Sequence, residues 1–209
     1  MTRDTLERKL DDCETAVETI LRRLVDVPHS KLAGDDLDRQ YRAAKQNAAK
    51  VRRQLAELTG DEHAVWLDLG VTPEAAVSGG MLIQTEEKCY LLFNISGPPV
   101  ANCIPQAIVE FDAPLKTQFG VPNDEALDGH PLSDSGLGAY DAFEVINSRW
   151  LAEERRRNQV VFPDSKFMYR HFIFTFHDST FECLANDLTI TVDTRSFEQI
   201  WQDFFPKIL

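Results

Sequence analysis

The stretch LERKLDDCETAVETILRRL (residues 6–24), together with LDRQYRAAKQNAAKVRRQLAEL (residues 37–58), decides the fold of the N-terminal part of the chain. In both, apolar or small side chains recur at alternating intervals of four and three residues, as at the a and d positions of a coiled coil. The first row is Leu6, Leu10, Cys13, Val17, Ile20 and Leu24, and the second is Leu37, Tyr41, Ala44, Ala48, Val51, Leu55 and Leu58. Pro28 and Gly34 separate the rows. We therefore expect an antiparallel hairpin of two helices, over residues 4–27 and 36–59.

Two further apolar residues, Leu21 and Val25, widen the stripe of the first helix beyond this seam. Soluble monomers rarely leave a large apolar patch uncovered. We expect Leu21 and Val25 to form an interface, either with a second copy of the chain in a homodimer or with a protein partner.

The rest of the chain has the pattern of an antiparallel sheet. Runs of apolar residues predict strands at residues 81–86, 89–96, 107–112, 172–176, 181–185 and 188–192. The last three are close together and predict a consecutive meander. Residues 112–138, rich in proline and glycine, predict one long loop.

Helical spacing of apolar residues predicts one long helix over residues 139–158 and an amphipathic C-terminal helix that Pro206 stops. The fold class is thus α+β: a helical hairpin (1–62), followed by an antiparallel β-sheet domain (63–209) with one long helix and a C-terminal helix packed on it. The strand 172–176 carries three phenylalanines on one face. We expect Phe143, Trp150 or Trp201 from the helices to cover that face.

The net charge of −12 is concentrated in the middle of the chain. Residues 61–148 hold 2 basic and 14 acidic side chains, whereas the flanking segments are almost neutral. Such a surface repels phosphate backbones, so we expect no nucleic-acid partner. Because no apolar run approaches the ~20 residues of a membrane helix and none follows the N-terminus as in a signal peptide, we expect a cytoplasmic protein without a membrane partner.

The cysteines and histidines show no metal-ligand spacing. Cys13, Cys89, Cys103 and Cys183 are scattered and form no CxxC pair. We expect buried reduced thiols, no bound metal and no cofactor.

Polar side chains gather at the turn after residue 176, and they form the first candidate site. His177, Asp178 and Glu182 are residue types that carry out acid–base chemistry. The simpler interpretation is a solvated turn, because aspartate and serine are ordinary turn formers.

The long loop forms the second candidate site, with His130 inside it and Tyr140 just after it. Long loops in compact domains often bind ligands, but the glycine spacing here matches no phosphate-binding motif. The simpler interpretation is an irregular connector.

These observations favour a non-enzymatic, cytoplasmic interaction or regulatory protein whose hairpin mediates self-association or docks a partner. One alternative is a small enzyme or ligand-binding domain with its site between the 112–138 loop and the 171–185 hairpin. A pocket joining His130, Tyr140 and His177 would favour that alternative. Another is an acidic protein that neutralises a basic partner, for which the evidence is the acidic middle segment alone.

Overall fold

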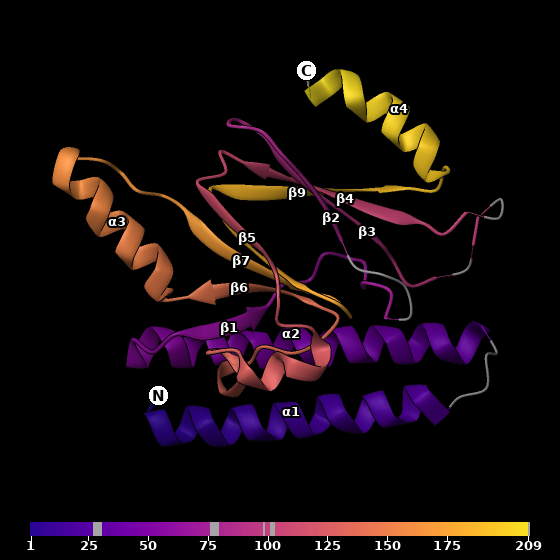
Figure 1. Cartoon of the computed structure of the whole chain (residues 1–209). Coiled ribbons are helices and arrows are strands. Elements are labelled where there is room, and N and C mark those ends of the chain that lie inside the picture. The colour runs from indigo at the N-terminus through magenta and orange to yellow at the C-terminus, as the bar shows by residue number, and fades with distance from the viewer. Residues whose placement is uncertain (27–30, 76–79, 98, 101–102, 209) are drawn as a thin grey trace.

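The computed structural model describes residues 1–209 except 27–30, 76–79, 98, 101–102 and 209 (Figure 1). The helices are α1 (Arg3–Asp26), α2 (Lys31–Thr59), α3 (Arg149–Val161) and α4 (Phe197–Ile208), with 3₁₀ turns η1 (Asp124–Gly129) and η2 (Ser133–Ser135). The strands are β1 (His63–Trp66), β2 (Met81–Gln84), β3 (Cys89–Asn94), β4 (Gln106–Asp112), β5 (Lys116–Gly120), β6 (Ala142–Ile146), β7 (Arg170–Thr175), β8 (Thr180–Ala185) and β9 (Asp187–Asp193). The α+β class with an N-terminal helical hairpin is confirmed.

The hairpin consists of α1 and α2, which run antiparallel and side by side (Figure 1). Leu6 and Leu10 are buried against Val51 and Leu55, as the seam pattern predicts. Helix α2 begins at Lys31, earlier than expected, so that Gly34 lies inside the helix. One glycine inside a helix of this length costs only about 1 kcal/mol.

The β domain contains two antiparallel sheets rather than one. One has the strand order β1-β6-β7-β8-β5 and the other β2-β3-β4-β9. The expected meander is therefore wrong in its last strand, because β9 leaves β8 and pairs along its whole length with β4. The alternation of apolar and polar residues within a strand does not indicate which distant strand it pairs with.

The main core lies between the two sheets and is rich in aromatic rings. Phe172 and Phe174 from one sheet are both fully buried and meet Phe111 from the other, with ring centroids 6.1 and 5.8 Å apart. The expectation that helices cover this face is wrong: Phe93 of β3 and Phe111 of β4 cover it. Packing one apolar face of each sheet against the other buries both of these faces.

The helix expected over residues 139–158 is also wrong in its first half. Residues 142–146 form β6, and α3 begins only after Ser148, whose hydroxyl accepts a hydrogen bond from the amide of Leu151 as an N-cap. Phe143 and Val145 are both buried, and their spacing of two residues is that of one face of a strand.

The segment 112–138 is likewise more than a loop. It contains β5, which pairs with β8, and the turns η1 and η2. Leu127, Leu132 and Leu137 from this segment cluster with Ile173 of β7 and Phe143 of β6. The segment thereby covers the face of the five-stranded sheet that points away from the main core.

Polar contacts fasten the hairpin to the edge of the five-stranded sheet. The side chain of Asn147 donates a hydrogen bond to the carbonyl of Ala56 at 2.8 Å, and Arg53 pairs with Glu144 at 2.6 Å. Glu144 also pairs with Arg170 at 2.9 Å. Helix α2 therefore has a fixed position over β1 and β6, and the candidate site lies at this junction.

Candidate functional site

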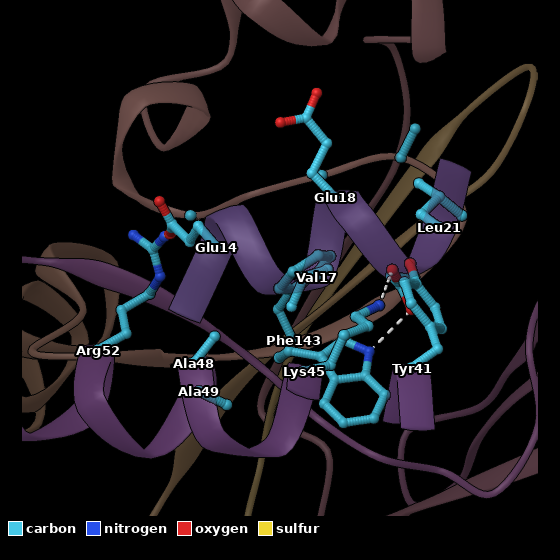
Figure 2. A pocket seen from close by; sticks show the side chains of 15 residues that line it. Glu14, Val17, Glu18, Leu21, Tyr41, Lys45, Ala48, Ala49, Arg52 and Phe143 are labelled. Atoms are coloured by element: carbon cyan, nitrogen blue, oxygen red, sulfur yellow. Dashed lines mark hydrogen bonds and ion pairs between the residues drawn. The ribbon is translucent and has the colours of Figure 1, made fainter. Parts of the chain in front are cut away.

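A pocket of about 360 Å³ lies where α1, α2 and the residues around β6 meet (Figure 2). Val17 and Leu21 line it from α1, and Tyr41 and Ala48 line it from α2. Phe143 of β6 closes part of its floor. The volume and the mostly apolar lining are those of a pocket for a small molecule.

The pocket opens where the helical seam has small side chains. At the closed end, the seam is filled by Leu10 and Val51. One turn of α2 before Val51, Ala48 and Ala49 reach only to Cβ, and the pocket extends from them to Val17. Ala48 thus borders the pocket on one side and packs against the buried seam cluster on the other.

Lys45 of α2 is the main charged group of the pocket. Its side chain is 12% exposed and its Nζ forms a short ion pair with a carboxylate oxygen of Asp141. The other oxygen of Asp141 accepts a hydrogen bond from Trp66 Nε1 at 2.8 Å. Nζ also lies 4.5 Å from the centre of the Trp66 ring and 5.4 Å from that of Tyr41.

Burial affects the titration of both Lys45 and Tyr41. It lowers the pKa of Lys45, and the attraction of Asp141 only partly offsets this effect. Burial, together with the charges of Asp141 and Asp38, raises the pKa of Tyr41 to about 12. Near neutral pH the Tyr41 phenol is therefore protonated and is able to donate a hydrogen bond.

At the other end of the pocket, Arg52 forms a short ion pair with Glu14 of α1. Its guanidinium lies directly against Gly136, where a Cβ would come within 2.6 Å of the Arg52 Cζ and 2.5 Å of the Ala64 carbonyl oxygen. Gly136 also has a φ of +98°, a conformation that favours glycine. This glycine allows the 136–143 segment to approach the hairpin closely enough to form the pocket wall.

A second polar cluster joins two of the residues that the sequence singled out. Asp124 of η1 accepts hydrogen bonds from the Tyr140 hydroxyl and from His177 Nδ1, the latter at 3.0 Å. The hydrogen bond to Asp124 raises the pKa of His177, and those from Tyr140 and His177 lower the pKa of Asp124. Tyr140 has a φ of +58°, which is unusual for a residue other than glycine. Asp178 lies exposed at the neighbouring turn.

A third cluster surrounds Glu182, whose carboxylate contacts His171 and His130. One carboxylate oxygen lies 2.9 Å from His171 Nε2 and the other 3.6 Å from His130 Nε2. Burial alone would raise the pKa of Glu182, but hydrogen bonds from His130 and His171 lower it to about 2. The Ser148 hydroxyl lies 2.8 Å from His171 Nδ1.

The Ser148–His171–Glu182 order resembles a catalytic triad in composition, but its environment is that of a core network. Ser148 is 4% exposed and His171 3% exposed, and the Ser148 hydroxyl is already engaged as the cap of α3. His130 Nδ1 accepts the amide hydrogen of Leu132, which places the proton of His130 on Nε2, facing Glu182. We assign this network to the attachment of α3 and the 121–140 segment to the sheet.

The structure therefore separates the residues that the sequence grouped. Tyr140 and His177 meet at Asp124, whereas His130 and Glu182 belong to the third cluster. Leu21 borders the pocket and is 43% exposed, and Val25 lies farther along α1 at 78% exposure.

Sequence reasoning missed the central residues of the pocket: Lys45, Trp66, Asp141. Trp66 lies 75 residues and Lys45 lies 96 residues from Asp141 in the sequence. Hydrophobic and charge patterns carry no information about contacts between residues so far apart.

Within the described part of the chain, no three histidine, cysteine, aspartate or glutamate side chains are grouped so as to hold a metal ion. No helix among the described residues is long and apolar enough to cross a membrane. No protein-family model, curated protein or solved structure matches this chain.

Proposed function

We propose that this protein binds a small molecule between its helical hairpin and its five-stranded sheet, and acts as a regulatory binding protein. The observation that carries the proposal is the pocket of about 360 Å³ with the Lys45–Asp141 pair in its wall. A mostly apolar cavity with a few fixed polar groups is the usual form of a ligand site.

The walls define the chemistry of the ligand. Aromatic rings of Tyr41, Trp66 and Phe143 suit a flat or ring-shaped apolar body. Among the described residues, Asp141 is the one hydrogen-bond acceptor of the Lys45 ammonium, which has three N–H groups. Its remaining donors are suited to a ligand oxygen.

The charges of the pocket favour an uncharged ligand. Lys45 is paired with Asp141 and Arg52 with Glu14, and the further acid Glu18 also lines the space. A strongly anionic ligand would have to compete with these carboxylates for both cations. A neutral molecule with one polar oxygen would not.

Binding would also link parts of the chain that are distant in sequence. A molecule in the pocket touches α1, α2 and the residues next to β6 at once, and would stabilise the packing of the hairpin on the sheet. A regulatory role follows if a partner recognises the hairpin in that state.

The direct test is titration with prodan, an uncharged naphthyl ketone whose emission shifts to the blue in an apolar site. Ala48→Phe fills the pocket and should weaken prodan binding about tenfold or more, an increase in ΔG of about 1.4 kcal/mol. The matched control is Ala43→Phe on the exposed face of the same helix, which should bind as the wild type does. An equal loss of prodan affinity in both variants, or no loss of affinity in either, contradicts the proposal.

Self-association through α1 is a second candidate, supported by the exposure of Leu21 and Val25. A two-fold pairing of hairpins would bury both side chains. Light scattering at micromolar concentration should then give twice the chain mass of 23.7 kDa, and the Leu21→Asp/Val25→Asp variant should give the monomer. Thr19→Asp, elsewhere on α1, is the control. A wild-type mass of one chain removes this candidate.

A further inference from the structure

Lys45 has a position that suits more than hydrogen bonding. This inference rests on the ligand site proposed above. We propose that the side-chain amine of Lys45 binds the ligand covalently by forming an imine with it. The ligand would be an aldehyde or ketone whose apolar body is about the size of a ring. Three features of the structure support this assignment: the location of the amine, the carboxylate beside it and the walls around it.

The amine is at the pocket wall and is held in place from both sides. The Lys45 side chain extends from α2 (Figure 2). Its Nζ lies 4.5 Å from the centre of the Trp66 ring. Its exposed fraction of 12% is far below that of Lys88 or Lys116, whose side chains are 47% and 43% exposed. A carbonyl compound in the pocket would meet this amine, whereas surface lysines meet mainly water.

Asp141 is a fixed proton carrier next to the amine. Its side chain accepts from Trp66 Nε1 and from Lys45, and its backbone amide donates to the hydroxyl of Thr175. Its backbone carbonyl accepts from the amide of Thr175. Carbinolamine formation and dehydration both require a group that gives and takes protons at hydrogen-bond distance.

The surroundings of Lys45 make the reactive, neutral form of its amine more accessible than in a solvent-exposed lysine. Burial lowers the pKa of Lys45, and the charge of Arg42 on the same helix adds to this effect. Asp141 and Asp68 act in the opposite direction. A desolvated lysine of this kind is the usual amine of protein Schiff bases.

The reaction balances without an oxidant or reductant. The Lys45 ammonium passes one proton to Asp141, and the neutral amine attacks the carbonyl carbon to form the C–N bond. The carbonyl oxygen takes the proton from Asp141, giving a carbinolamine with a cationic nitrogen. That nitrogen then returns a proton to Asp141, which donates it to the hydroxyl. The C–O bond breaks, water leaves, and the nitrogen lone pair forms the C=N bond of an iminium paired with the Asp141 carboxylate.

The walls would protect this product. Tyr41 and Phe143 border the space around the amine, together with aliphatic side chains from both helices. Because hydrolysis of an imine requires water at the C=N carbon, an apolar wall prolongs its lifetime.

The test uses cinnamaldehyde with cyanoborohydride, which reduces an imine to a stable amine, at neutral pH on the full chain. Peptide mass spectrometry compares Lys45 with Lys50, an exposed lysine on the same helix. We expect Lys45 to be labelled about tenfold faster or more, as a lysine with a lowered pKa should be. Lys45→Arg should abolish the fast labelling of the protein, and Lys50→Arg should leave the labelling rate of Lys45 unchanged.

The pocket variant separates this inference from the proposed function. Ala48→Phe should slow labelling of Lys45 about tenfold, while Ala43→Phe should not. If prodan binds at the pocket but Lys45 is labelled no faster than Lys50, the covalent inference is wrong and the binding function stands. If Lys45 is labelled rapidly but Ala48→Phe has no effect, capture within the pocket is wrong.

Discussion

Glu182→Gln is expected to remove a large part of the acid sensitivity of this fold. The carboxylate of Glu182 is held by two imidazoles, and its pKa is lowered from 4.5 to about 2. At about 1.4 kcal/mol per pKa unit, this shift corresponds to about 3 kcal/mol of folding free energy. Because the pKa is lower in the folded state, this stabilisation is present above pH 4.5 and is lost as the pH falls towards 2.

The assay is urea unfolding between pH 7 and pH 3. From the folded and unfolded pKa values of Glu182, the wild type should lose about 2 kcal/mol of its free energy of unfolding through this group between pH 7 and pH 3. Glu182→Gln should lack this part of the pH dependence of stability. Glu86→Gln, an exposed acid in the turn between β2 and β3, should keep the wild-type slope. The reasoning about the His130–Glu182–His171 cluster is refuted if Glu182→Gln and the wild type lose stability in parallel.

Two further variants test the packing of the domain. Phe174→Ala should lower the free energy of unfolding by about 3–5 kcal/mol, because the fully buried ring of Phe174 lies between the two sheets. Phe119→Ala should cost much less, because the Phe119 side chain is 41% exposed. Equal losses of stability in urea unfolding would contradict the two-sheet core. Ser148→Ala removes the N-cap of α3 and the hydroxyl partner of His171, and should cost about 1–2 kcal/mol by thermal or urea unfolding. Ser165→Ala, an exposed serine, should cost almost nothing, and a Ser148→Ala protein as stable as the wild type would show that the cap does not fasten α3.

The hairpin could be predicted because its information is local. A helix places residues three and four apart on one face, so the rows ending at Leu24 and Leu58 define a seam without any knowledge of the rest. Strands β2, β3 and β4 were also predicted, because a short apolar run between turn residues is likewise a local signal. The helix over 139–158 failed because Tyr140, Phe143 and Trp150 also fit helical spacing, and only the cap at Ser148 marks where the helix begins.

The candidate site could not be predicted because its parts meet only in the folded chain. Lys45 belongs to a helix face rich in basic residues and is indistinguishable from a solvated lysine in sequence. Asp141 lies directly before β6, in a segment that the pattern assigned to a helix. Glu182 was grouped with His177 by proximity, although strand alternation puts it on the opposite face from Phe181 and beside His171.

The most direct test of the central claim is a proton–nitrogen NMR titration of the three tryptophan indole N–H resonances with prodan. The Trp66 indole donates to Asp141 inside the pocket, whereas Trp150 packs on His171 and Trp201 stacks on Phe197. The account predicts that the Trp66 resonance shifts and saturates while the other two stay in place. A titration in which Trp150 or Trp201 shifts and Trp66 does not would contradict a ligand site between the hairpin and the sheet.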